Sequence, residues 1–159
     1  MSNPAKKKGT QFESSYVNYL RAQAGAEVWH KAQHGTKDEG DLSIMAHGRE
    51  LAVECKCVER MTTKLLAQFR LQATVEAQRA GADGGVLLTW RPGKGYRWDA
   101  SPSGERAKSF GENLAHMTVE TLLRASGATG DVAMDEVALG TWVTMTLADF
   151  ALIVAEVAS

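Results

Sequence analysis

The chain has 159 residues, of which 44% are hydrophobic and 23% are charged, and this is the length and apolar content of one globular domain with a proper core. No segment approaches about 18 consecutive apolar residues, and the Lys-rich start lacks the apolar stretch of a secretory signal, so we expect a cytoplasmic protein without a membrane span. The net charge of -1 argues against nucleic-acid binding driven by overall charge.

Basic residues gather in two segments of the chain. The first segment, residues 1–8, has no hydrophobic periodicity and is predicted to be a flexible basic tail that can touch phosphates. The second lies in a Gly/Pro/Ser-rich stretch over residues 91–108. We expect residues 9–159 to form one domain, with its core over about residues 9–91 and a C-terminal elaboration over residues 92–159.

An amphipathic helix is predicted from Thr10 to Ala24, because apolar residues recur there at steps of three and four, and Gly25 ends it. Glu13 lies on the apolar stripe of this helix. A buried carboxylate is costly unless a partner or a metal ion compensates its charge, so Glu13 is unusual at this position. A short strand is predicted next, over Val28–His30.

A β-hairpin is predicted after a polar loop. Its strands are Asp41–Ala46 and Glu50–Val58, and a tight turn at His47-Gly48 joins them. Because side chains alternate along a strand, Glu54 and Lys56 project side by side from one face. The hairpin therefore brings an acid and a base together.

The second half of the core is predicted to be a helix and a strand. The helix begins at Thr62 or Thr63, runs to about Ala80, and is ended by Gly81. The apolar run over residues 85–90 is typical of a strand inside a sheet. The order helix, hairpin, helix, strand predicts an α/β domain with a mixed central sheet flanked by helices.

Two later stretches, residues 116–123 and 144–151, resemble each other. In each, a strand is expected to pass into a short helix, with a Thr positioned to cap the helix. True structural repetition and chance recurrence of a common capping pattern explain this likeness equally well. The apolar strand and helix over residues 141–157 are assigned either to core packing or to a dimer interface.

The residue types on the hairpin fit the cleavage of a phosphodiester. A Mg²⁺ ion held by hard oxygen ligands supplies a nucleophilic water, charge stabilisation and help for the leaving oxygen. Asp41 and Glu54 converge as ligands in the predicted hairpin, and Cys55 adds its backbone carbonyl. Lys56 would orient the attacking water or neutralise the developing charge.

The segments Gly40-Asp41-Leu42 and Val53-Glu54-Cys55-Lys56 resemble the core motif of the PD-(D/E)xK nuclease superfamily, with Gly40 in place of the nominal proline. The upstream segment Lys8-Gly9-Thr10-Gln11-Phe12-Glu13 resembles the opening helix of archaeal-type and phage Holliday junction resolvases, where a helical acid joins the metal site. The likeness covers roughly residues 8–90 and implies a restriction-endonuclease-like fold. It implies that Mg²⁺ or Mn²⁺ is bound by Glu13, Asp41, Glu54 and the carbonyl of Cys55, and that Glu13, Asp41, Glu54 and Lys56 are catalytic.

The implied function is a Mg²⁺-dependent endodeoxyribonuclease that cleaves branched DNA, such as a Holliday junction, in DNA recombination. Resolving a junction calls for two matched incisions, so we expect a two-fold symmetric homodimer. A phage origin would suit the short chain and would place the enzyme in the host cytoplasm. The alternatives are a nuclease of the same superfamily that acts on linear or host DNA, and a non-catalytic DNA-binding module of the same fold.

Other residues have competing interpretations. In the structural alternative, Glu54 and Lys56 form a surface pair on an exposed strand, and Asp41 caps a turn. Gln72, on the core side of the second helix, is either a hydrogen-bond donor near the site or a satisfied structural residue. The two cysteines lack the spacing of a zinc site, and Gly93-Lys94-Gly95 lacks that of a P-loop, so neither zinc nor a nucleotide cofactor is expected.

Overall fold

The computed structural model describes residues 16–30, 41–57, 61–90, 113–127 and 140–155. These residues form one sheet of six strands in the spatial order β1-β2-β3-β4-β5-β6. The strands are β1 (Glu27–His30), β2 (Leu42–Ala46), β3 (Arg49–Cys57), β4 (Gly84–Trp90), β5 (Leu114–Thr118) and β6 (Trp142–Thr146). The described helices are residues 16–24, α2 (Thr63–Ala80), α3 (Val119–Ala125) and α5 (Leu147–Val154). Strands β3 and β4 are parallel, and the other neighbouring pairs are antiparallel. The predicted α/β class with a mixed sheet is confirmed.

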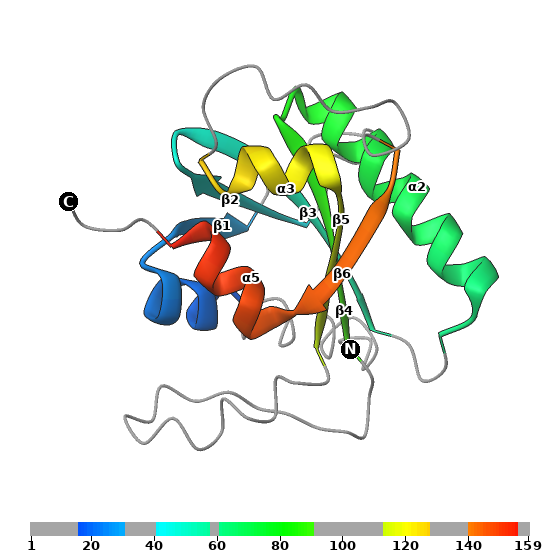
Figure 1. Ribbon diagram of the computed structural model, residues 1–159, viewed down its shortest axis with the longest axis horizontal. Coiled ribbons are helices and arrows are strands. Elements are labelled where there is room, and N and C mark those ends of the chain that lie inside the picture. The colour runs from blue at the N-terminus through cyan, green and yellow to red at the C-terminus, as the bar shows by residue number, and fades with distance from the viewer. Residues whose placement is uncertain (1–15, 31–40, 58–60, 91–112, 128–139, 156–159) are drawn as a thin grey trace, which may run out of the picture.

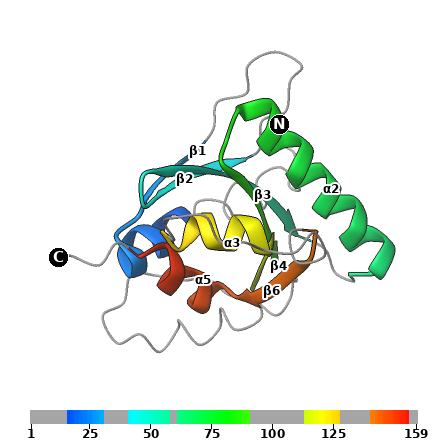
Figure 2. The ribbon, with the colours of Figure 1, turned by 45° about the horizontal axis from the view of Figure 1, so that its top comes forward.

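Helices cover both faces of this sheet (Figure 1). Figure 2 shows α2 on one face, while the helix of residues 16–24 lies with α3 and α5 on the other. Helix α2 makes the crossover that parallel strands require, since it joins β3 to β4. The sheet therefore has a face covered by three of the described helices and a face covered by α2.

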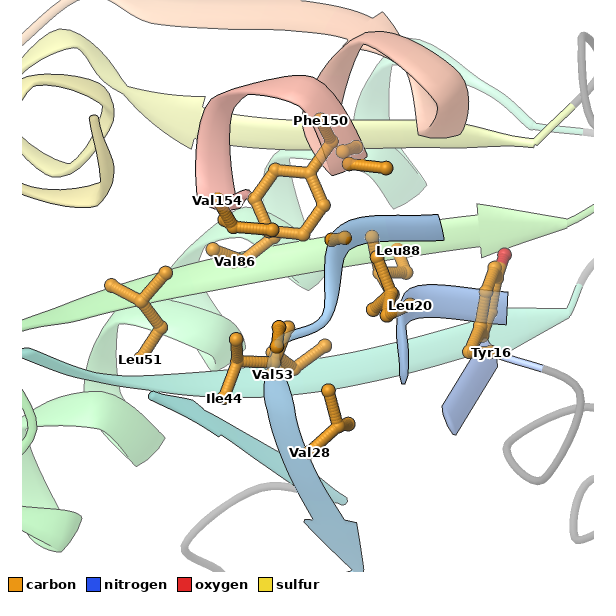
Figure 3. Packing of buried hydrophobic residues seen from close by; sticks show 14 of the residues in the cluster. Tyr16, Leu20, Val28, Ile44, Leu51, Val53, Val86, Leu88, Phe150 and Val154 are labelled. Carbon is orange, nitrogen blue, oxygen red and sulfur yellow. The ribbon is translucent and has the colours of Figure 1, made fainter. Parts of the chain in front are cut away.

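The face under the three helices holds the main hydrophobic core. Figure 3 shows Tyr16 and Leu20 of the first helix and Phe150 of α5 packed over Val86 and Leu88 of β4, and all five are fully buried. Because side chains alternate along a strand, the intervening residues of β3 and β4 point toward α2. Alternate residues of β3 and β4 therefore face the hydrophobic core, and the residues between them face α2.

The β2–β3 hairpin forms as predicted. His47 has a φ of 51° and Gly48 a φ of 77°, and positive φ at both central residues is the signature of a type I′ turn. This turn fixes the register in which Leu42 pairs with Val53 and Ala46 with Arg49. A two-residue turn with this twist leaves little freedom for the strands to slip.

Helix α2 has the predicted boundaries. The Thr62 side chain accepts a hydrogen bond from the first turn, and Gly81 ends the helix in the left-handed conformation at a φ of 66°. The helix approaches the sheet closely at Gly85, where a Cβ atom would lie 2.7 Å from the carbonyl oxygen of Ala73. Only glycine permits this approach. The approach buries Ala73 and also Glu76, a residue that we did not predict to be buried.

The two stretches that resemble each other adopt the same local structure. Thr118 ends β5 and caps α3, and Thr146 ends β6 and caps α5, each by accepting a hydrogen bond from the backbone N–H three residues later. The strands are antiparallel neighbours, with Leu114 opposite Thr146. The predicted passage from strand to capped helix is therefore confirmed in both stretches.

No helix in the described ranges is long and apolar enough to cross a membrane. Several predicted features lie outside the described residues. They are the basic tail over residues 1–8, Glu13, and the basic stretch over residues 91–108.

Candidate functional site

Two hydrogen bonds hold Asp41 against strand β3. Its backbone N–H donates to the carbonyl oxygen of Val53 over 2.8 Å, and its Oδ2 atom accepts from the backbone N–H of Cys55 over 2.8 Å. Val53 and Cys55 flank Glu54 in the chain. The hairpin therefore brings the carboxyl groups of Asp41 and Glu54 into electrostatic contact.

Glu54 lies on the α2 face of β3, and its side chain is only 4% exposed. Its Oε1 atom lies 3.1 Å from Nζ of Lys56 and accepts a hydrogen bond from Nε2 of Gln72 over 3.3 Å. Its Oε2 atom is also buried and receives no hydrogen bond from the described residues. The alternative of a surface pair on an exposed strand is therefore wrong, because β3 and α2 enclose the carboxyl group.

Lys56 is fixed between the strand and the helix. Its Nζ atom pairs with Glu54 on one side and lies 5.2 Å from the centre of the Phe69 ring of α2 on the other. A cation over an aromatic ring is attracted by the negative face of the ring. The Lys56 side chain keeps 25% of its surface exposed, so it is less buried than Glu54, of which 4% is exposed.

Besides Phe69, helix α2 contributes two polar residues to the same site. Nε2 of Gln72 donates to Oε1 of Glu76 over 2.8 Å as well as to Glu54, so one amide joins the two acids. Glu76 is 2% exposed. Gln72 therefore donates to both acids, and its role at a functional site stays a prediction.

Sequence reasoning missed Glu76, although its spacing carries a signal. Residues four apart face the same side of a helix, so Gln72 and Glu76 are neighbours. Each precedes an alanine, Ala73 or Ala77, that packs against Gly85 of the sheet. Small residues such as Ala73 and Ala77 allow a helix to pack closely on a sheet. The polar residues Gln72 and Glu76 next to them could therefore have been predicted to be buried at this contact.

The surroundings of Glu54 strongly favour its neutral form. They raise its pKa from 4.5 to about 10, first through burial, then through a hydrogen bond with the carboxyl group of Glu76 and the negative charges of Asp41 and Glu76. Lys56 acts in the opposite direction. A hydrogen bond between two carboxyl groups requires a proton on one of them, and a bound divalent cation would displace such a proton.

The donor set fits a hard divalent cation. Asp41, Glu54 and Glu76 supply the carboxylate oxygens that Mg²⁺ and Mn²⁺ prefer, and Oε2 of Glu54 is a buried acceptor without a donor among the described residues. Within the described ranges, no three acidic, histidine or cysteine side chains already stand in a metal-binding arrangement. Mg²⁺ commonly uses one or two carboxylates and keeps several waters, so it does not require three preassembled side chains.

For two of the predicted ligands, Glu13 and the backbone carbonyl of Cys55, a ligand role stays a prediction. Glu13 lies outside the described residues, and its role stays a prediction. The Cys55 side chain packs against the hydrophobic core, on the opposite face from Glu54, so the thiol points away from the site. A ligand role for the Cys55 backbone carbonyl likewise stays a prediction.

A polar cluster lies beside the site on the same face of the sheet. His116 of β5 is buried, and its ring nitrogens Nε2 and Nδ1 lie 2.9 Å from the hydroxyl oxygens of Thr89 and Thr144, respectively. Burial and then the positive charge of Arg70 lower its pKa to about 4. Arg70 also lies over the ring of Trp142, 5.3 Å from its centre. This cluster joins strands β4, β5 and β6 under α2.

The first helix is tied to the sheet by Tyr16. Its hydroxyl oxygen lies 3.2 Å from the carbonyl oxygen of Thr89 and 3.1 Å from Oδ1 of Asn113. A phenol has one proton to donate, so these two acceptors share it. The contact fixes the start of the described helix at the end of β4, close in sequence to the predicted ligand Glu13.

No family model matches this sequence, and no curated protein matches it significantly. Among solved structures, the fold is similar to that of a Holliday junction resolvase from Archaeoglobus fulgidus, with 15% sequence identity and a TM-score of 0.45. The match covers 91% of this chain and 95% of that chain.

Proposed function

We propose that this chain is a Mg²⁺- or Mn²⁺-dependent endodeoxyribonuclease that cleaves branched DNA such as a Holliday junction. The observation that carries the proposal is the environment of Glu54. This buried carboxyl group has Asp41 beside it, Lys56 on one oxygen, and no donor among the described residues for the other oxygen. Such a group is costly for stability and is suited to binding a cation.

Each residue has a defined part in the proposed reaction. The cation would supply a nucleophilic water and neutralise charge on the scissile phosphate. Asp41 and Glu54 would hold the cation, with Glu13 as the proposed third acid. Lys56 would place its ammonium group against the attacking water or the phosphate, because Phe69 and Glu54 restrict where that group can lie.

Two features of the sequence support DNA as the substrate and a junction as its preferred form. The basic segments over residues 1–8 and 91–108 offer phosphate contacts in a chain whose net charge is close to zero. The segment over residues 8–13 resembles the opening helix of junction resolvases. A homodimer would supply the two matched incisions that resolution needs.

Cleavage assays with four-way junctions, matched linear duplexes and single strands, each with Mg²⁺, Mn²⁺ or a chelator, test the proposal. We expect paired cuts in the junction with either cation and no cutting with the chelator. Equal cleavage of duplex and junction would favour a nuclease for linear DNA. Binding of the junction without cutting would favour the non-catalytic DNA-binding module. Sedimentation of the protein with and without junction DNA tests the dimer.

Two variants test the site directly. Glu54→Gln keeps the shape of the side chain and removes its charge, and we expect it to abolish cutting while DNA binding persists. Glu50→Gln is the matched control, because Glu50 lies on the same face of β3 but is hydrogen-bonded to Ser43 at the other end of the strand. Cutting by Glu54→Gln at the wild-type rate would contradict the proposal.

A further inference from the structure

Glu76 is a second buried acid beside Glu54, and it comes from a different element. Only 2% of Glu76 is exposed, and its carboxyl group shares the amide donor of Gln72 with the carboxyl group of Glu54. Burial of one carboxyl group against another is unfavourable, because each disfavours ionisation of its neighbour. A position selected for stability alone would hold an apolar residue or a neutral amide here.

The amide of Gln72 fixes the spacing between the two acids. It donates to Oε1 of Glu54 over 3.3 Å and to Oε1 of Glu76 over 2.8 Å, so both carboxyl groups present one oxygen to the same donor. Gln72 and Glu76 lie one turn apart on α2, and Gly85 lets this helix approach the sheet closely. The convergence of Glu54 and Glu76 is thus built into the contact between helix and sheet.

The surroundings of Glu54 point to a divalent cation. Asp41 and Glu76 both act on Glu54 through their negative charges, and Lys56 pairs with one of its oxygens. The buried Oε2 atom of Glu54, which has no donor among the described residues, is an independent sign that a ligand belongs in this space.

We propose that Glu76 is a further cation-binding acid of the site, carried by α2, and that Gln72 is a positioning residue that sets its distance from Glu54. The inference rests on the proposed metal-dependent activity and adds an acid that the hairpin motif does not contain. Hairpin and helix then share the cation. Binding of the cation would pull α2 and β3 together, since each supplies ligands of the same ion.

The test uses the full-length protein, without DNA, and measures Mn²⁺ binding and thermal unfolding. We expect Glu76→Gln to weaken Mn²⁺ binding by about tenfold or more, in line with losses at supporting positions of metal sites. Its unfolding temperature without metal should stay the same or rise, because a buried charge is removed. The rise in unfolding temperature that Mn²⁺ produces should shrink.

Glu76→Asp is the conservative rescue variant, since it keeps the charge on a shorter side chain, and we expect it to recover part of the Mn²⁺ affinity. A purely structural role for Glu76 predicts the opposite pattern, with a lower unfolding temperature without metal and wild-type Mn²⁺ affinity in Glu76→Gln. That pattern would overturn the inference. Glu50→Gln should match the wild type in both measurements.

Glu54→Gln separates failure of this inference from failure of the proposed function. Loss of Mn²⁺ binding in Glu54→Gln with wild-type affinity in Glu76→Gln would overturn the role of Glu76 and leave the proposed site in place. Wild-type Mn²⁺ affinity in both variants would overturn the site itself. Weakened binding in both variants supports both proposals.

Discussion

The carboxylate of Asp41 accepts a hydrogen bond from the backbone N–H of Cys55 over 2.8 Å, so the strand that carries Glu54 also fixes the position of Asp41. The donor is a backbone group and does not depend on the thiol of Cys55, which packs into the core. The geometry of the acidic pair is therefore a property of the backbone of the hairpin. It tolerates side-chain changes at position 55 that preserve the core.

Two variants of Asp41 separate the effect of its charge from the effect of its hydrogen bond. In Asp41→Asn the side-chain oxygen can still accept from Cys55, but the negative charge is lost, so we expect cleavage to fall by about 100-fold or more with little change in stability. Asp41→Ala also removes the acceptor and should lower the free energy of unfolding by about 1–2 kcal/mol. Single-turnover cleavage and urea unfolding measure the two effects. A fully active Asp41→Asn protein would remove Asp41 from the site.

Lys56 should act on the chemical step. We expect Lys56→Ala to reduce the single-turnover rate by about 100-fold, the usual cost of losing one stabilising group for transition-state charge. DNA binding should change little, since one partly buried cation contributes only part of the phosphate contacts. Rate and binding constants measured at one salt concentration check this. An unchanged rate would assign Lys56 to folding alone.

Phe69 should affect the site through Lys56. Phe69→Leu keeps an apolar side chain on α2 and removes the ring that lies under the ammonium group, which costs about 0.5–1 kcal/mol, or a rate loss of about two- to fivefold. Leu71→Ala is the control on the same helix, because Leu71 is 66% exposed. Equal effects of the two changes would mean that the ring does not orient Lys56.

His116 makes the fold sensitive to acid. Its pKa of about 4 in the folded protein lies below its value of 6.5 in the unfolded chain, so the unfolded state binds more protons between these two values. The free energy of unfolding should therefore fall as the pH drops from 6.5 to 4, by up to about 3 kcal/mol from this residue. Urea unfolding from pH 7 to pH 4.5, compared between wild type and His116→Gln, isolates the contribution. Identical pH dependence of the two proteins would contradict it.

Gln72 should influence both acids together. Gln72→Ala removes the shared donor, so we expect weaker Mn²⁺ binding and slower cleavage, each by about tenfold. Thr74→Ala is the control on the same helix, since the Thr74 hydroxyl donates only to the carbonyl of Arg70 within the helix. Wild-type Mn²⁺ affinity in Gln72→Ala would show that the acids keep their places without the amide.

The hairpin could be predicted because its determinants are local. His47-Gly48 specifies the turn, and strict alternation along β3 separates Val53 and Cys55 on the core side from Glu54 and Lys56 on the other. The Thr residues that cap α2, α3 and α5 are equally local signals, since each bonds a backbone group within its own first turn.

Glu76 could not be predicted in the same way, because its burial depends on a distant contact. Polar residues of a helix usually face solvent, and periodicity alone does not tell how deep a helix sits. The depth of α2 follows from Gly85, which lies on the next strand and lets Ala73 touch the sheet. The pairing of β5 with β6 could not be predicted for a related reason. The hydrophobic pattern of a strand indicates which face is buried, but it does not identify the neighbouring strand.

The described residues of the site, from Asp41 to Glu76, belong to one uninterrupted stretch made of β2, β3 and α2. Contacts between residues that are near in sequence close short loops and form at low entropic cost, so this stretch can assemble early in folding. Strand β4 then fixes the depth of α2 through Gly85, and the strands that follow extend the sheet. Changes in β5, β6 and their connections can accordingly accumulate without rebuilding the hairpin and helix that carry these acids, whereas Gly85 of β4 has to stay small.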